Sequence, residues 1–90
     1  MALVAVIFKI MPVSPDVDLK KLRENIEKKL KEIGAMLHKA DEEPIAFGLK
    51  ALIFTIGWKE ERDPDVIESS LSKIKDVNSV EIIDVRRAIG

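Results

Sequence analysis

The side chains best suited to chemistry are gathered in the middle of the chain, in the segment from His38 to Gly48. The histidine and the carboxylates of Asp41, Glu42 and Glu43 could hold a metal ion or form an acid–base pair. However, the sequence has no second histidine and no cysteine to complete a ligand set. The alternation of side chains along an extended segment would also separate these groups. We therefore expect no catalytic residue and no metal site, and we interpret the acidic triplet as a solvated turn.

The same segment continues with a proline, an aromatic residue and a glycine, directly before an apolar run. The stretch from Pro44 to Gly48 is typical of an exposed loop that presents one aromatic ring, that of Phe47. On a small rigid domain, such a ring is more often a contact for a partner protein than part of a substrate pocket. The alternative is that Phe47 folds back onto the core, because phenylalanine is commonly buried.

Length and composition limit the possible functions. We expect residues 1–90 to form a single domain with a modest core. A net charge of −1 with 34% charged residues does not fit a net-basic nucleic-acid binder. The apolar stretch from Ala2 to Ile10 is too short to cross a membrane and lacks the features of a signal peptide. The absence of cysteine is compatible with a reducing cytoplasm. Because no glycine-rich phosphate loop is present, we expect no bound nucleotide and no cofactor.

Hydrophobic periodicity predicts four strands and two helices. Asp18 and Gly34 are suited to cap the first helix, and Asp63 followed by Pro64 is a helix-start signal. The last strand has apolar residues of both parities, which indicates either a bulge or cover on both faces. The expected elements are a strand over 3–11, a helix over 19–33, a short strand over 35–39, a strand over 49–58, a second helix with its apolar stripe at Ile67, Leu71 and Ile74, and, after a turn at Asn78–Ser79, a strand over 80–87.

This β-α-β-β-α-β order predicts an α+β fold, the ferredoxin-like two-layer sandwich, with a four-stranded antiparallel sheet and two helices on one face. The first strand is apolar on both faces, so we expect it to be central. The face without helices then keeps some apolar surface, which either has a function or is covered by a dimer. An RNA-recognition sheet needs aromatic residues on its central strands with lysines or arginines around them. That pattern is missing here, because Phe8 and Phe54 lie in apolar runs interrupted only by Lys9 and Lys50.

Three motifs together resemble translation elongation factor 1-beta of the archaeal type, over essentially the whole chain. The resemblance implies a guanine-nucleotide exchange factor for elongation factor 1-alpha, the GTPase that delivers aminoacyl-tRNA. It also implies a cytoplasmic protein that makes and breaks no covalent bond. The motifs are Met11-Pro12-x-Ser14-Pro15-x-x-Asp18, His38-Lys39-x-Asp41-Glu42-Glu43-Pro44-Ile45-Ala46-Phe47-Gly48-Leu49, and Asp84-Val85-Arg86-Arg87.

The resemblance also implies two partner-binding segments. One is the loop of Ala46, Phe47 and Gly48, which matches the family segment that docks an aromatic ring on a second domain of the GTPase. The other is the C-terminal segment of Arg86, Arg87, Ala88 and Ile89, which matches the segment near the Mg²⁺ and phosphate region. Eukaryotic relatives carry a penultimate lysine where this chain ends in Ala88-Ile89-Gly90, so an arginine would have to supply the cation.

We expect the protein to be a monomer on its own, with no direct contact to nucleic acid or membrane. The alternative function is a ligand-binding or oligomerising regulatory module on the same fold. A tight homodimer that buries the helix-free face of the sheet would favour that alternative.

Overall fold

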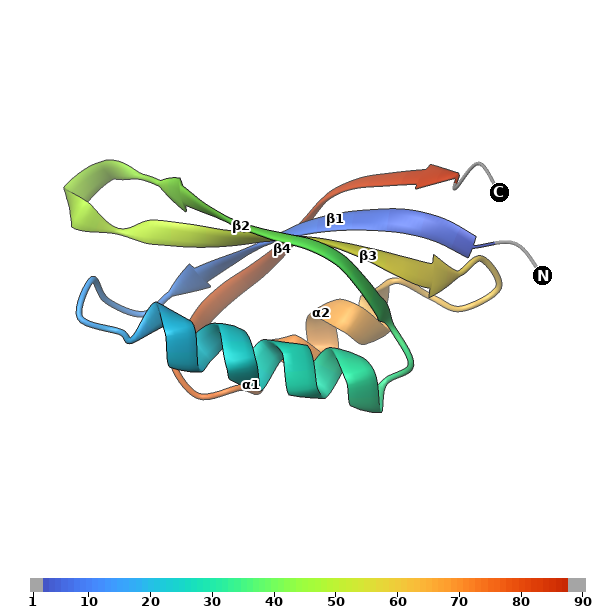
Figure 1. Cartoon of the computed structure of the whole chain (residues 1–90), viewed down its shortest axis with the longest axis horizontal. Helices are drawn as coiled ribbons and strands as arrows, with labels where there is room; N and C mark the ends of the chain where they lie inside the picture. Colours follow the sequence, from blue (N-terminus) through green and yellow to red (C-terminus); the bar gives the residue numbers. More distant parts are fainter. Residues whose placement is uncertain (1–2, 88–90) are drawn as a thin grey trace.

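The computed structural model describes residues 3–87. Within them, the strands form one antiparallel sheet in the order β2-β3-β1-β4. The sequence therefore predicted the element order and the ferredoxin-like α+β fold correctly, with β1 and β3 as the central strands (Figure 1). The elements are β1 (Leu3–Pro12), α1 (Leu19–Glu32), β2 (Met36–Pro44), a 3-10 turn (Ala46–Gly48), β3 (Lys50–Lys59), α2 (Asp65–Leu71) and β4 (Val77–Arg87).

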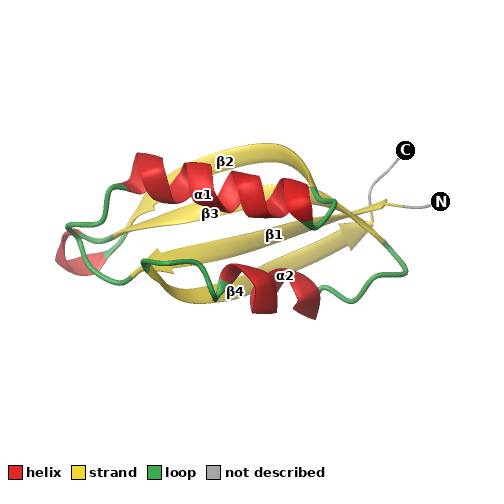
Figure 2. Cartoon of the chain, turned by 90° about the horizontal axis from the view of Figure 1, so that it is seen from below, coloured by secondary structure: helices red, strands yellow, loops and turns green. Residues whose placement is uncertain are grey.

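Both helices lie on the same face of the sheet, and the core is the layer between them and the strands (Figure 2). Alternate residues of the two central strands point into this layer. The rings of Phe8 and Phe54 stack there with their centroids 5.4 Å apart. The residues of these strands and of α1 in the core cluster are Val4, Val6, Phe8, Ile10, Leu52, Phe54, Ile56, Trp58, Leu22, Ile26 and Leu30.

Both predicted caps of α1 are confirmed. The carboxylate of Asp18 accepts hydrogen bonds from the backbone N–H groups of Lys20 and Lys21, at 3.1 and 3.3 Å. At the other end, Gly34 adopts a φ of 81°, and the Ala35 N–H donates to the Leu30 carbonyl at 2.9 Å. This is the Schellman arrangement, which favours glycine because of its left-handed backbone.

Arg62 joins the connection between β3 and α2 to the end of α1. Its Nη1 donates to the Ile33 carbonyl at 2.6 Å, and its guanidinium lies 4.2 Å from the centre of the Trp58 ring. The Trp58 indole N–H in turn donates to the Arg62 carbonyl at 3.2 Å. The local sequence pattern does not indicate this clamp, because the hydrogen bond from Arg62 to Ile33 joins residues 29 positions apart.

Three predicted boundaries were wrong. The second helix ends at Leu71, so Ile74 of its predicted apolar stripe lies beyond α2. The acidic triplet is not in a turn but in the second half of β2, which extends to Pro44. As an edge strand, β2 can carry charged side chains because most of it faces solvent. Likewise, Asn78 and Ser79 belong to β4, and the chain turns earlier, at Asp76, whose φ is 73°.

Of the two interpretations left open for β4, a bulge or cover on both faces, the structure shows the bulge. Asp84 pairs with Ile7 of β1, and Ile82 pairs with Phe8, so Ile83 is the extra residue between them. The bulge explains why apolar residues of both parities occur in one strand.

Candidate functional site

Phe47 lies at the tip of the hairpin formed by β2 and β3. The turn is closed by two backbone hydrogen bonds, from the Ile45 N–H to the Leu49 carbonyl at 2.7 Å and from the Leu49 N–H to the Ala46 carbonyl at 3.3 Å. Phe47 has a φ of 64° and a ψ of 28°, and Gly48 follows with a φ of 75°. A left-handed backbone is uncommon for a bulky residue and costs on the order of 1–3 kcal/mol.

The Phe47 side chain projects into solvent. It is 93% exposed, which is the largest exposed fraction among the exposed large hydrophobic residues of the described chain. The alternative that Phe47 caps the core is therefore wrong. The fold holds an aromatic ring in water on a strained backbone. Because strained backbone conformations cluster at functional sites, Phe47 is a candidate contact residue.

The acidic residues below this tip face lysines rather than one another. Asp41 pairs with Lys39 at 3.4 Å, and Glu43 pairs with Lys9 at 3.9 Å. Glu42 lies 4.0 Å from the ammonium of Lys50. Such exposed pairs contribute little to stability. They show that the triplet is a charged strand edge.

His38 is the bulged residue of β2, between the pairs that Leu37 and Lys39 make with β3. Its ring lies close to Gly57, since a Cβ built on that glycine would be 3.5 Å from Nε2. Within residues 3–87, no cluster of three or more His, Cys, Asp or Glu side chains could hold a metal ion.

The two candidate arginines lie at the end of β4, on opposite faces of the strand. Arg86 pairs with Ala5 and shares the helix-free face with Asp84, to which its Nε donates at 2.6 Å. Arg87 pairs with Val4, and its Nη2 lies 3.1 Å from the carboxylate of Glu60. The predicted alternation of the two side chains is confirmed. Ala88 and Ile89 lie outside the described residues.

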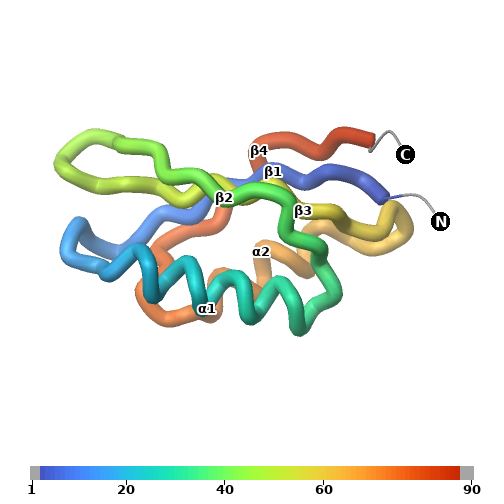
Figure 3. The backbone as a smooth tube through the Cα atoms, viewed as in Figure 1, coloured from blue at the N-terminus to red at the C-terminus, as the bar shows by residue number. Residues whose placement is uncertain are grey.

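The two candidate segments lie at opposite ends of the molecule. The tube view shows the hairpin tip at one end of the long axis, and the start of β1 and the end of β4 at the other (Figure 3). The strand pairing agrees, because Lys50 begins β3 at the tip, whereas Arg87 pairs with Val4 near the N-terminus. The long axis measures 41 Å. One partner must therefore be large to touch both segments at once.

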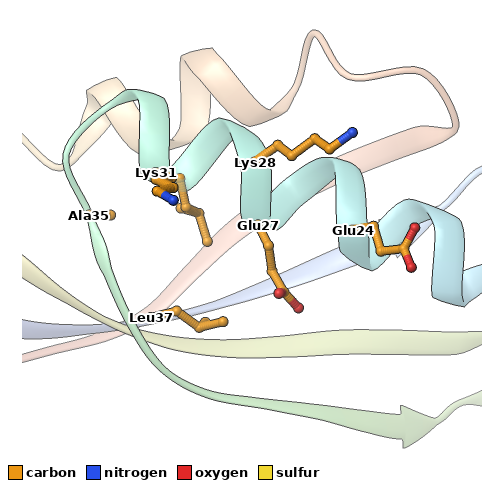
Figure 4. Close-up of a pocket in the computed structure, with 7 residues that line it drawn as sticks. Glu24, Glu27, Lys28, Lys31, Ala35 and Leu37 are labelled. Atoms are coloured by element: carbon orange, nitrogen blue, oxygen red, sulfur yellow. The ribbon is translucent and has the colours of Figure 1, made fainter.

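A groove of about 440 Å³ runs between α1 and β2. Leu37 projects from β2 into the space below α1, and Glu27 extends from α1 toward Leu37 (Figure 4). None of the predicted contact residues lines this groove. A second cleft, of about 360 Å³, opens at the hairpin end between the β1–α1 loop and Gly48. In the described residues, no helix is long and apolar enough to cross a membrane.

Comparisons with known proteins agree with this architecture and with the motifs. The chain is similar to elongation factor 1-beta of Methanothermobacter thermautotrophicus, with 49% identity over 80 residues, 88% of this chain and 89% of that protein. It is 41% identical to elongation factor 1-beta of Methanocaldococcus jannaschii over 90 residues, covering 98% of this chain and 100% of that protein.

Solved structures of distant sequence share the fold. One is the C-terminal domain of the MgtC protein from Mycobacterium tuberculosis, with a TM-score of 0.64 at 11% identity over 97% of this chain and 88% of that one. Another, BlrP1 BLUF, has a TM-score of 0.63 at 17% identity and covers 100% of this chain and 57% of that one. At such identities the likeness concerns the fold alone.

The family profile described as the EF-1 guanine nucleotide exchange domain matches residues 5–88. The match spans the hairpin with its exposed ring, both arginines, and every strand of the sheet except the first two residues of β1. The chain therefore belongs to the EF-1 guanine nucleotide exchange domain family.

Proposed function

We propose that this protein promotes the release of GDP from elongation factor 1-alpha by contacting the GTPase at both ends of its sheet. Membership in the exchange-domain family supports the exchange activity and the partner. The observation that carries the mode of contact is Phe47, a ring 93% exposed on a strained turn. We also propose that residues 1–90 form a single exchange domain.

Exchange of this kind requires a difference in affinity rather than covalent chemistry. A protein that binds the nucleotide-free GTPase more tightly than the GDP-bound form must weaken GDP binding by the same factor. A rigid sheet with an anchor at the tip suits this task, because it can hold one part of the GTPase while the other end acts near the nucleotide. Phe47 is the anchor in this scheme, and burial of its ring supplies affinity.

The arginines supply the cation at the far end. A guanidinium is permanently charged and can form paired hydrogen bonds with carboxylate or phosphate oxygens. Both arginines are held by exposed carboxylates, Arg86 by Asp84 and Arg87 by Glu60. These pairs are weak enough to exchange for a partner. A GTPase that crosses the helix-free face of the sheet meets Arg86, whereas one that crosses the helices meets Arg87.

We expect a monomer at assay concentrations that acts in the cytoplasm. We expect no direct nucleic-acid contact, because Phe8 and Phe54 are buried under the helices and cannot stack on bases. The alternative, a ligand-binding or oligomerising module, would be favoured by a tight homodimer that covers the helix-free face.

The test is the rate at which labelled GDP leaves elongation factor 1-alpha when excess unlabelled GDP is added. Catalytic amounts of this protein should accelerate release, and the protein alone should not hydrolyse GTP. Phe47→Ala combined with Arg86→Ala and Arg87→Ala should lose most of the acceleration while remaining folded. An unchanged release rate with saturating wild-type protein would refute the exchange function. A fully active triple variant would refute only the contact residues.

A further inference from the structure

β4 forms one edge of the sheet, and within residues 3–87 it pairs only with β1. Its central part carries exposed apolar side chains, with Ile83 52% and Val85 46% exposed. The other edge, β2, is protected by its charged second half and by Pro44 at its end. β4 has no proline and is the longest strand described, with 11 residues. An edge of this kind can accept another strand.

The bulge at Ile83 decides which residues of β4 share a face. Glu81 and Arg86 pair with Lys9 and Ala5, which lie on the helix-free face of β1. Ile82 and Val85 pair with Phe8 and Val6, which face the helices. Because opposite residues of an antiparallel pair point to the same side, the charged residues form one matched set and the apolar residues another.

These sets are self-complementary when β4 meets a second copy of itself in the antiparallel direction. One register places Glu81 of each copy opposite Arg86 of the other and, at the same time, Ile82 opposite Val85. A shift by one residue sets side chains of opposite faces against each other. A shift by two residues places Glu81 opposite Asp84 in one direction, and removes the charge pairing in the other. The bulge therefore leaves one favourable register.

We propose that two copies of this chain associate through β4 in this register, related by a two-fold axis, so that the sheet continues across both copies. Each copy offers the same patch, as a two-fold contact requires. Opposite charges and apolar pairs directly across a strand pair are both stabilising. A single strand seam is smaller than a stable dimer interface, so the dissociation constant is expected on the order of 0.1–1 mM.

Arg86 lies in this seam and is also a proposed contact for the GTPase. A paired copy is therefore expected to be inactive in exchange when the GTPase crosses the helix-free face and uses Arg86, and to stay active when Arg87 is the arginine that acts. This consequence rests on the proposed function, whereas the pairing itself does not.

The experiment is sedimentation equilibrium of the full chain from about 10 µM to about 2 mM, a range that brackets the expected constant. The mean mass of the wild type should rise from monomer toward dimer. Glu81→Arg places two arginines opposite each other, and Arg86→Glu two glutamates, so each variant alone should stay monomeric. An equal mixture of the two restores opposite charges and should associate again. Lys75→Glu, an exposed reversal outside β4, is the control and should behave like the wild type.

Circular dichroism checks that each variant is folded. A wild type that stays monomeric over the whole concentration range would overturn the pairing. The edge of β4 would then be available to a strand of another protein. Self-association that survives both single reversals would place the contact elsewhere. Failure of the mixture to associate, when the wild type does, would overturn the register.

Discussion

Replacing Phe47 with alanine separates the stability of the free protein from its affinity for the GTPase. Complete burial of a phenylalanine is worth about 3 kcal/mol at most, and the 7% of this side chain that is buried accounts for about 0.2 kcal/mol. A loss of this size lowers the melting temperature of a 90-residue domain by only about 1–2 °C. If the ring is an anchor, its loss should instead cost about 2 kcal/mol of binding.

The expected weakening of the complex is therefore about 30-fold in the dissociation constant. Titration calorimetry with nucleotide-free elongation factor 1-alpha measures that constant, and calorimetric melting of the free protein measures stability. Phe54→Leu is the matched control, because Phe54 is fully buried. It should lower stability by roughly 1 kcal/mol and leave affinity for the GTPase nearly unchanged. Normal affinity in Phe47→Ala, or a large loss of its stability, would refute the anchor role.

Three further changes test other parts of the structure. One of the single substitutions Arg86→Ala and Arg87→Ala should slow GDP release at least tenfold, which is about 1.4 kcal/mol in the activation barrier, and the other should be nearly silent. If the C-terminal segment acts on Mg²⁺, the defect should shrink when EDTA is added. Full activity of the double variant would exclude a role for either arginine in exchange. Arg62→Ala removes the hydrogen bond to the Ile33 carbonyl and should lower the free energy of unfolding by about 1.5–3 kcal/mol in denaturant titrations, whereas an unchanged midpoint would show that the clamp is dispensable. Asp18→Ala should cost about 1 kcal/mol through loss of the helix cap, measured in the same way, and Asp18→Asn should restore most of it.

The sequence predicted the elements whose signals are local and strong. Apolar residues on both faces predicted the central position of β1, and the caps at Asp18 and Gly34 bounded α1 to within a residue. The extent of β2 could not be predicted in this way. Its second half is charged because it is an edge strand, and edge position is a property of the assembled sheet.

The candidate site was predicted in part. The exposure of Phe47 followed from its neighbours, but its left-handed backbone did not, since only the hairpin register shows where the turn must close. Alternation predicted that Arg86 and Arg87 lie on opposite faces. Their carboxylate partners were not predicted, because the contact of Arg87 with Glu60 joins residues far apart in the chain. The Arg62 clamp was missed for the same reason.

In the proposed function, exchange results from a difference in affinity between two states of the GTPase. The most direct measurement is the dissociation constant of this protein with elongation factor 1-alpha, determined once without nucleotide and once with saturating GDP and Mg²⁺. We expect markedly tighter binding to the nucleotide-free form, by the same factor by which the protein weakens GDP binding. Equal affinities for the two forms would contradict it.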